Sequence, residues 1–457
     1  MWTGVPDQRC GMDVEGFARR RLLRGEPEGE VVRAVTRHVM ALKGWGKERA
    51  EGFARAVVRD AGEAMRSQNA EGMTGEVLRY PRADVGAGEF GVGSRGEGDF
   101  FVHRLLGRLA SGGELPAREM DDAGAVRAGS TYVGLAVDGM HSRLSEFPFL
   151  AGFHCARAAL RDVCVVGFKP VATLVDLHIA DDGDVGKLFD FTAGVACAGE
   201  VCSAPLVAGS TLRIGGDMVL GERLVGCAGA VGVSEEPPRL RRHAKPGDVL
   251  LMSTGKGGGT VSTIAVYHGW QEVVMRTLNV EFMLACEVLR SSGMLRHVNA
   301  MTDVTNGGVR GDAHEIAGAS KTRLVLEADA LYGAIDAEVL RMLRELGIDP
   351  LGISIDSLLL SVPEEHAEEL VEALSGVTEM HVVGRVEEGR GVYLEERGSR
   401  RRLEPRFREA AYTEVKRAVG EDAPEEVEVM RRRVESAWRR ALEKKRMVMR
   451  YIQEVEA

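Results

Sequence analysis

The stretch that most constrains the fold is residues 301–309, MTDVTNGGV. It begins with residues typical of a strand end, continues through Asp303, and closes with a Gly307-Gly308 turn before a helix. A helix that follows such a turn presents free backbone N–H groups, which bind anions. A carboxylate at a strand end is a hard oxygen ligand that suits Mg²⁺. The stretch therefore predicts a site for a metal ion and an anion at a strand-to-helix junction.

Four other segments combine carboxylates or small residues with predicted strands, helices or turns. They are 121–126 (DDAGAV), 137–140 (VDGM), 161–167 (RDVCVVG) and 207–211 (VAGST). Asp162 falls inside an otherwise apolar helix, where an unpaired carboxylate is costly to bury, so it is exposed, paired or bound to a cation. Each segment alone is weak evidence, because an Asp before a Gly turn is more often a capping residue. The combination of these segments, in this order, is stronger evidence for a functional site than any one of them alone.

Strands and helices alternate from about residue 131 onward, which is typical of a mixed α/β (α+β) fold. The expected strands are 132–137, 172–177, 249–252, 298–301, 323–327, 357–362 and 380–386, and the expected helices are 153–167, 185–202, 280–292, 309–318, 336–346 and 364–375. Pro237-Pro238 marks a linker between two α/β units. The predicted organisation is a helical N-terminal extension (1–85), two α/β domains (86–235 and 236–396) and a basic helical C-terminal extension (397–457).

The C-terminal extension contains one long amphipathic helix. Its apolar stripe consists of Val427, Met430, Val434, Trp438, Ala441, Val448, Ile452 and Val455. We expect both extensions to pack against the acidic two-domain body or across a dimer, and to shape access to the site without supplying catalytic groups. The alternative is that the C-terminal helix binds a partner protein.

The composition of the 457-residue chain excludes several functional classes. With 44% hydrophobic residues it is globular, and it has neither an apolar run long enough to cross a membrane nor the apolar segment of a signal peptide. Residues 81–396 hold 28 Arg and Lys against 45 Asp and Glu, a net −17 that disfavours nucleic acid. The seven cysteines form no CxxC pair, so we expect free thiols in a reducing cytoplasm. Four Asn and four Gln beside 69 acidic and 59 basic residues fit a thermophilic source.

Two further features have a plainer interpretation. Residues 255–260, GKGGGT, lack the residue order of a P-loop and predict a strand-to-helix turn. His141, His154 and His178 lie near the predicted site without metal-ligand spacing. Each of the three is therefore expected to be structural or substrate-facing, and no catalytic residue is assigned.

In order and spacing these segments resemble the aminoimidazole-ribonucleotide-synthetase superfamily, which has the PurM-like fold. The matching signatures are DDAGAV at 121–126, VDG at 137–139, TDVTxGG at 302–308 and the strands at 354–363 and 381–386. The resemblance covers about residues 86–395. It implies a homodimer of two-domain subunits, in which an ATP-binding, dimerising domain precedes a second α/β domain.

The resemblance also implies a set of ATP- and Mg²⁺-binding residues. The implied metal ligands are Asp121, Asp122, Asp138, Asp162 and Asp303. The implied nucleotide-binding residues are Gly91, Gly93, Arg95, Gly209, Ser210, Thr211, Thr305, Asn306 and Gly307. This donor set suits phosphoryl transfer, which needs neutralised charge and aligned reactants more than a strong base.

Departures from the family pattern bear on which branch of the superfamily the chain resembles most. Ser210 stands where relatives often carry a carboxylate, with Asp217 as the candidate substitute, and Asn306 stands where thiamine-monophosphate kinases usually carry an aspartate. Residues 86–98 lack the cysteine of selenophosphate synthetases, and the chain ends in Glu456-Ala457 rather than in the cysteine of the hydrogenase maturation factor. The latter branch is the nearest, because residues 301–319 have a similar turn-helix run.

Two functions follow as hypotheses. The first is an ATP- and Mg²⁺-dependent enzyme that phosphorylates or activates an oxygen of a small-molecule or protein-bound substrate, as in hydrogenase or cofactor maturation. The alternative is a non-catalytic ATP-binding maturation or scaffold protein of the same fold. Both hypotheses imply a cytoplasmic homodimer that pairs through residues 131–233, without nucleic acid or membrane as a partner.

Overall fold

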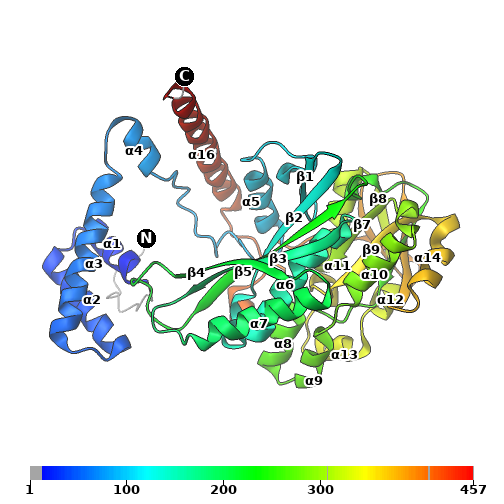
Figure 1. Ribbon diagram of the computed structural model, residues 1–457, viewed down its shortest axis with the longest axis horizontal. Helices are drawn as coiled ribbons and strands as arrows, with labels where there is room; N and C mark the ends of the chain where they lie inside the picture. The colour runs from blue at the N-terminus through cyan, green and yellow to red at the C-terminus, as the bar shows by residue number, and fades with distance from the viewer. Residues whose placement is uncertain (1–12, 306, 410–411, 456–457) are drawn as a thin grey trace.

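The computed structural model describes residues 13–305, 307–409 and 412–455, so Asn306 lies outside the described residues. Two β-sheets with their helices form the body, and helical units from both ends of the chain flank it (Figure 1). This arrangement confirms the predicted mixed α/β fold with helical N- and C-terminal regions. Among the described residues, no helix is long and apolar enough to cross a membrane.

The first sheet has five strands in the order β1-β2-β5-β3-β4. The strands are β1 (Gly124–Ala128), β2 (Thr131–Gly139), β3 (Lys169–Ile179), β4 (Leu206–Arg213) and β5 (Leu224–Ser234), and only β3 and β4 pair in parallel. The sequence pattern does not predict β5, although this strand lies at the centre of the sheet. Its glycines mask the strand pattern yet are needed, because a Cβ at Gly226 would lie 2.5 Å from the Asp176 carbonyl oxygen.

The second sheet has seven strands in the order β12-β11-β8-β10-β6-β9-β7. They are β6 (Asp248–Ser253), β7 (Ala300–Val304), β8 (Arg323–Glu327), β9 (Ser357–Pro363), β10 (Met380–Glu387), β11 (Gly391–Glu396) and β12 (Ser399–Arg402). Its helices are α8 (Gly259–His268), α9 (Gln271–Thr277), α10 (Glu281–Ser291), α11 (Gly308–Ser320), α12 (Ala328–Gly333), α13 (Ala337–Glu345) and α14 (Ala367–Leu374). The predicted strand at 298–301 is displaced: pairing of Val304 with Ser357 extends β7, so Asp303 is the penultimate residue of the strand.

Helix α6 (Pro148–Val165) is the structural link between the two domains. It packs with α7 (Gly186–Val201) on one face of the first sheet, and it also contacts α10 and β7 of the second domain (Figure 1). One continuous core therefore joins Leu160 and Val163 of α6 to Phe282 and Leu358. Because α6 is buried on nearly all sides, any polar side chain that it carries must find a buried partner.

The N-terminal helices α1 (Val14–Leu23), α2 (Glu28–Lys43) and α3 (Lys47–Ser67) form a small unit with its own apolar core. Leu220 of the β4–β5 connection completes that core, and Lys43 forms ion pairs with Asp181 and Asp182. A shorter helix, α4 (Gly72–Leu78), and a connecting segment then lead to α5 (Glu97–Gly107). The N-terminal extension is thus docked on the far end of the first sheet.

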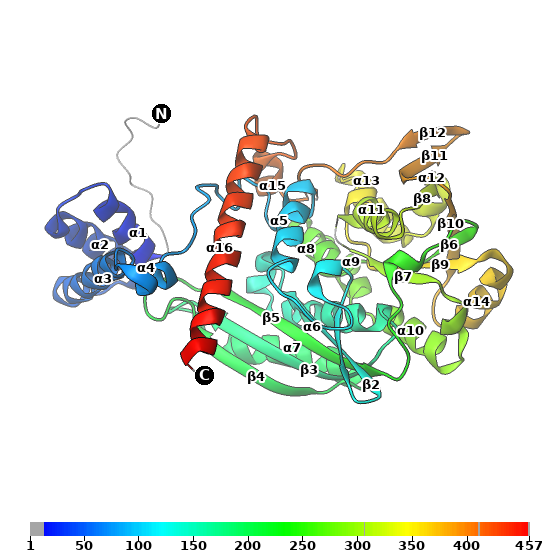
Figure 2. The same ribbon diagram turned by 90° about the horizontal axis from the view of Figure 1, so that it is seen from above.

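The C-terminal extension contains α15 (Glu414–Val419) and the long α16 (Val427–Val455). Helix α16 runs beside α5, as Figure 2 shows, and also contacts α4. Of the predicted apolar stripe, Met430 is buried, Val427, Val434, Trp438, Ala441 and Val448 are half-buried, and Ile452 is exposed. The stripe is therefore only partly covered within one copy of the chain.

Candidate active site

A cavity of about 640 Å³ opens where the two domains meet α6. Four elements supply most of its polar lining: the 120–124 segment, the end of β2, the middle of α6 and the end of β7. Its ionisable lining residues are Arg95, His103, Asp121, Asp122, Asp138, His141, Arg143, His154, Arg161, Asp162, Arg241, Asp303, Glu315, Asp356, Tyr412 and Lys416. All five predicted metal-ligand aspartates therefore face one space.

Asp122 lies in a buried ion-pair network around Arg241. The Arg241 guanidinium pairs with the Asp122 carboxylate and lies 2.6 Å from Glu315 Oε2, while the Thr302 hydroxyl donates to Asp122 at 3.1 Å. The Asp121 carboxylate accepts from the backbone N–H of Arg241 at 3.3 Å. Burial raises the pKa of Asp122 well above its usual range, and the Arg241 charge lowers it only in part.

Asp138, Asp162 and Asp303 form a second carboxylate group around Arg161. Arg161 pairs with Asp303, lies 3.5 Å from Asp162 Oδ1, and has no ion pair with Asp138 among the described residues. Burial raises the pKa of Asp162 well above its usual range, and the nearby Asp303 carboxylate raises it further. Burial likewise raises the pKa of Asp138. The set thus carries more negative charge than Arg161 alone neutralises.

Asp356 is a buried carboxylate that sequence analysis missed. It pairs with both Arg157 and Arg161, which lie one turn apart on α6. These two guanidinium groups hold its pKa below the usual range despite burial. Asp356 also has a positive φ of 63°, an uncommon conformation for a residue with a side chain. The two ion pairs with α6 therefore tie the second domain to the cavity wall.

The glycine-rich loop before α5 lies against the C-terminal extension. Gly93 and Arg95 line the cavity, whereas Gly91 does not. The buried carboxylate of Asp99 accepts from the backbone N–H of Gly93 at 2.8 Å and of Arg95 at 3.1 Å. Those N–H groups are already used, so the Arg95 side chain is what the loop offers to a phosphate.

The turn before α11 is also packed against this loop. Thr305 and Gly307 line the cavity, and the Thr305 hydroxyl donates to Asp303 Oδ1 at 3.0 Å. The buried Asp312 accepts from the Thr305 backbone N–H at 2.6 Å, and its other oxygen has no hydrogen-bond partner among the described residues. Gly307 requires its positive φ of 89°, since a Cβ would lie 2.7 Å from the Arg95 carbonyl oxygen.

Three predicted nucleotide-binding residues lie elsewhere. Gly209, Ser210 and Thr211 are in the middle of β4, an exposed edge strand, rather than at a strand end, and they do not line this cavity. Asp217, the candidate substitute for the carboxylate absent at Ser210, lies in the loop after β4 and pairs with Arg213. Within one copy of the chain, β4 is therefore separate from the carboxylates.

The carboxylates fit a hydrated Mg²⁺ better than a preformed cage. Among the described residues, no three cavity carboxylates bring ligand oxygens within 4.8 Å of one another. Mg²⁺ usually keeps several waters and binds one or two carboxylates together with substrate phosphates. The partly uncompensated carboxylates of Asp138, Asp162 and Asp303 supply the oxygen donors and negative charge that such an ion needs.

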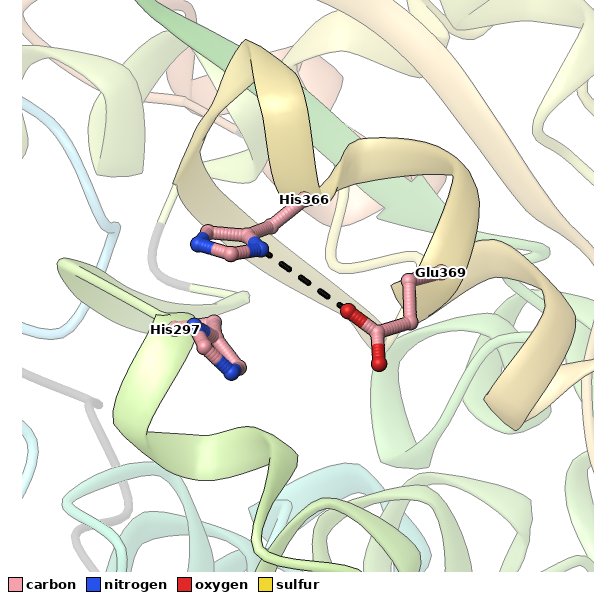
Figure 3. A group of neighbouring side chains, drawn as sticks. All are labelled: His297, His366 and Glu369. Carbon is pink, nitrogen blue, oxygen red and sulfur yellow. Dashed lines mark ion pairs between the residues drawn. The ribbon is translucent and has the colours of Figure 1, made fainter.

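A second cluster lies outside the cavity, on the second domain. His297, His366 and Glu369 bring three metal-ligating side chains together, as Figure 3 shows. His366 Nδ1 lies 3.8 Å from Glu369 Oε2, and the two imidazole centroids are also 3.8 Å apart. Arg296 Nε donates to His297 Nε2 at 3.0 Å. We assign no metal here, because the Arg296 guanidinium already occupies one ring nitrogen of His297.

The fold and the cavity define a two-domain α/β protein with an acidic site at the domain junction. Residues 120–233 match the N-terminal domain of AIR synthase related proteins, and residues 245–396 match the C-terminal domain of the same family. The chain belongs to the AIR synthase related protein family. A protein of Methanocaldococcus jannaschii, uncharacterized protein MJ1416, is 47% identical over 451 residues, which cover 97% of this chain and 99% of that protein.

Two further similar proteins match about two thirds of this chain. Thiamine-monophosphate kinase of Pyrococcus horikoshii is 24% identical over 299 residues, which cover 62% of this chain and 87% of the kinase. The crystal structure of hydrogenase maturation protein HypE in complex with ATP superposes with a TM-score of 0.51 at 19% identity, covering 67% of this chain and 90% of that one. The extensions are thus shared with the M. jannaschii protein, whose matching region spans almost the whole chain.

Proposed function

We propose that the chain is an ATP- and Mg²⁺-dependent enzyme that phosphorylates or activates an oxygen of a small-molecule or protein-bound substrate. The observation that carries this proposal is the meeting of Asp138, Asp162 and Asp303 in one cavity beside Arg95. The three aspartates come from β2, α6 and β7, so only the packed body unites them. A kinase and an ATP-bound protein among the similar proteins support the use of ATP.

The cavity residues would have different roles in such a reaction. Asp138, Asp162 and Asp303 would hold Mg²⁺, which when bound neutralises nucleotide phosphates and aligns them for transfer. The Arg95 side chain, which has no ion pair among the described residues, would bind phosphate oxygens. Arg161, tied to Asp303 and Asp356, keeps the carboxylates in position. Alignment and charge neutralisation are the main requirements of phosphoryl transfer.

Calorimetry tests the proposal directly. AMPPCP, a non-hydrolysable ATP analogue, is titrated into the full chain with and without Mg²⁺, and phosphate or ADP release from ATP is then measured with trial acceptors. Thiamine monophosphate is the first acceptor to try, because a curated relative is named for it. We expect Mg²⁺-dependent binding. An absence of nucleotide binding under both conditions would remove the proposal.

A non-catalytic ATP-binding scaffold is the second candidate, and two observations favour it. Arg241 and Arg161 already neutralise Asp122 and Asp303, and the carboxylate that relatives carry at the position of Ser210 is missing. Tight Mg·AMPPCP binding without ADP release across all acceptors would support this candidate. Within the enzyme proposal, maturation of hydrogenase or another cofactor is the branch we favour.

We also propose that the first sheet forms a homodimer interface. On β2, Leu135 and Val137 alternate with the buried Ala136, so they lie on the face away from the core. Strand β4 exposes Val207 and Leu212 and is an unpaired edge. A second copy of the chain covering this face would bury the apolar side chains and bring another surface close to Ser210.

A further inference from the structure

One part of the cavity wall comes from the C-terminal extension. Tyr412 and Lys416 line it, and both lie beyond residues 120–233 and 245–396, which match the family domains. The segment that carries them is anchored on both sides. Glu97 and Gly98 donate backbone N–H groups to the carbonyls of Arg406 and Phe407, and Tyr412 belongs to the apolar core of the second domain.

A buried ion pair holds the same segment in place. Glu409, only 3% exposed, accepts from Arg310 at 2.8 Å, and its backbone N–H donates to the Ser94 carbonyl at 3.0 Å. Breaking this buried pair would leave an uncompensated charge, so the segment is held firmly in the cavity wall. Through the hydrogen bond to Ser94, the segment also holds the glycine-rich loop in place.

The Lys416 ammonium is a cation without a carboxylate partner. Its Nζ lies 4.1 Å from the centroid of the Tyr412 ring, and no carboxylate of the described residues lies within ion-pair distance. Two histidines that line the same cavity, His141 and His154, add no charge. Burial, followed by the charges of Arg95 and Lys416, lowers the pKa of His141 to about 4. Burial and the Arg157 charge lower the pKa of His154 to about 3. Both rings are neutral at pH 7.

His154 carries a buried polar atom without a partner. The Thr277 hydroxyl donates its single hydrogen to the Val274 carbonyl at 2.7 Å, so it accepts from His154 Nε2–H at 3.2 Å. His154 Nδ1 is then an acceptor, and among the described residues it has no partner although the side chain is 4% exposed. A buried unpaired acceptor is costly, and this atom has almost no accessible surface, so it is an unsatisfied group beside the cavity rather than one that already faces a ligand.

We propose that the part of the cavity formed by Lys416, Tyr412 and His141 binds the acceptor substrate, a small molecule with a phosphate or carboxylate group. The anionic group lies at Lys416. This assignment of an acceptor rests on the proposed function, because Asp138, Asp162 and Asp303 are then reserved for Mg²⁺ and the nucleotide phosphates. The C-terminal extension would thus determine which acceptor the chain selects.

The experiment compares Lys416→Gln with Arg417→Gln, a matched control. Arg417 is the next residue of α15, pairs with Glu414, and does not line the cavity. Inorganic phosphate and, separately, acetate are titrated by calorimetry into the full chain saturated with Mg·AMPPCP. We expect Lys416→Gln to weaken binding of one or both anions about tenfold, Arg417→Gln to change it less than twofold, and neither variant to alter Mg·AMPPCP affinity.

Other outcomes contradict the assignment. Equal anion affinity in wild type and Lys416→Gln would overturn the anion site. Weakened Mg·AMPPCP binding with unchanged anion binding would place the nucleotide at Lys416 instead. If wild type does not bind Mg·AMPPCP, the proposed function fails. The anion titrations without nucleotide then still test Lys416. Circular dichroism and the melting temperature establish that each variant folds.

Discussion

Replacing Asp303 with asparagine separates a metal-ligand role from a structural one. Asp303 is 1% exposed, pairs with Arg161 through one carboxylate oxygen and accepts from the Thr305 hydroxyl through the other. Asparagine has nearly the same shape and keeps one acceptor oxygen, but it removes the charge. Arg161 retains Asp356 as a partner, so the loss of stability should stay near 1–2 kcal/mol, below the roughly 3–5 kcal/mol expected when a buried charge loses its only partner.

Mg·ATP affinity should fall much more than stability does. Losing one anionic ligand of a bound cation is expected to weaken binding at least tenfold, or about 1.4 kcal/mol. Calorimetric titration of Mg·AMPPCP into wild type and Asp303→Asn measures this directly, and thermal unfolding measures the stability change. Asp217→Asn is the matched control, because Asp217 is also ion-paired but lies outside the cavity. Wild-type affinity in Asp303→Asn would show that the metal assignment is wrong.

Three further predictions follow from the same structure. The pKa values of Asp138 and Asp162 are raised on folding, so their contribution to the stability of the ligand-free chain is present at low pH and is lost as the pH rises through the folded-state values. Because Mg²⁺ needs the ionised forms, its stabilising effect in thermal shift assays should grow between about pH 4 and 8. A flat profile would contradict this prediction. Light scattering should show a dimer at micromolar concentration, and Val207→Glu on β4 should shift it toward monomer; a monomeric wild type would remove the interface. Deleting residues 420–457 should lower the melting temperature by several degrees, because the buried Met430 and the contacts of α16 with α5 are lost. The affinity for Mg·AMPPCP should stay within a few-fold of the wild-type value. Unchanged stability and solubility would instead favour partner binding by α16.

Much of the fold was predictable because its signals are local. The alternation of strands and helices, the long amphipathic α16 and the helices of the N-terminal unit all follow from periodicity within a short window. The strands that were missed, such as β5, are rich in glycine, and their pattern is set by close strand contacts rather than by side-chain alternation. Residues 399–402 form β12 of the second sheet, beyond the predicted domain boundary at 396, because they pair with β11.

The position of the aspartates could be inferred in part from the sequence. Asp162 was expected to be exposed, paired or bound to a cation, and it is largely buried beside Arg161. Its neighbour Arg161 gave no local sign that it would pair with Asp303 and Asp356, which lie 142 and 195 residues away. The same holds for Arg241 and Asp122, which are 119 residues apart. Such partners become visible only when distant elements pack together.

The sequence by itself determined the family, the two α/β units and the carboxylate-bearing segments, since these depend on residue type, order and local spacing. Tertiary structure decided which groups share the cavity. It placed Gly209, Ser210 and Thr211 on an exposed strand, used the Gly93 and Arg95 N–H groups to bind Asp99, and brought Tyr412 and Lys416 into the cavity wall. The physical reason is that burial and charge neutralisation are properties of a packed volume, to which residues hundreds of positions apart contribute together.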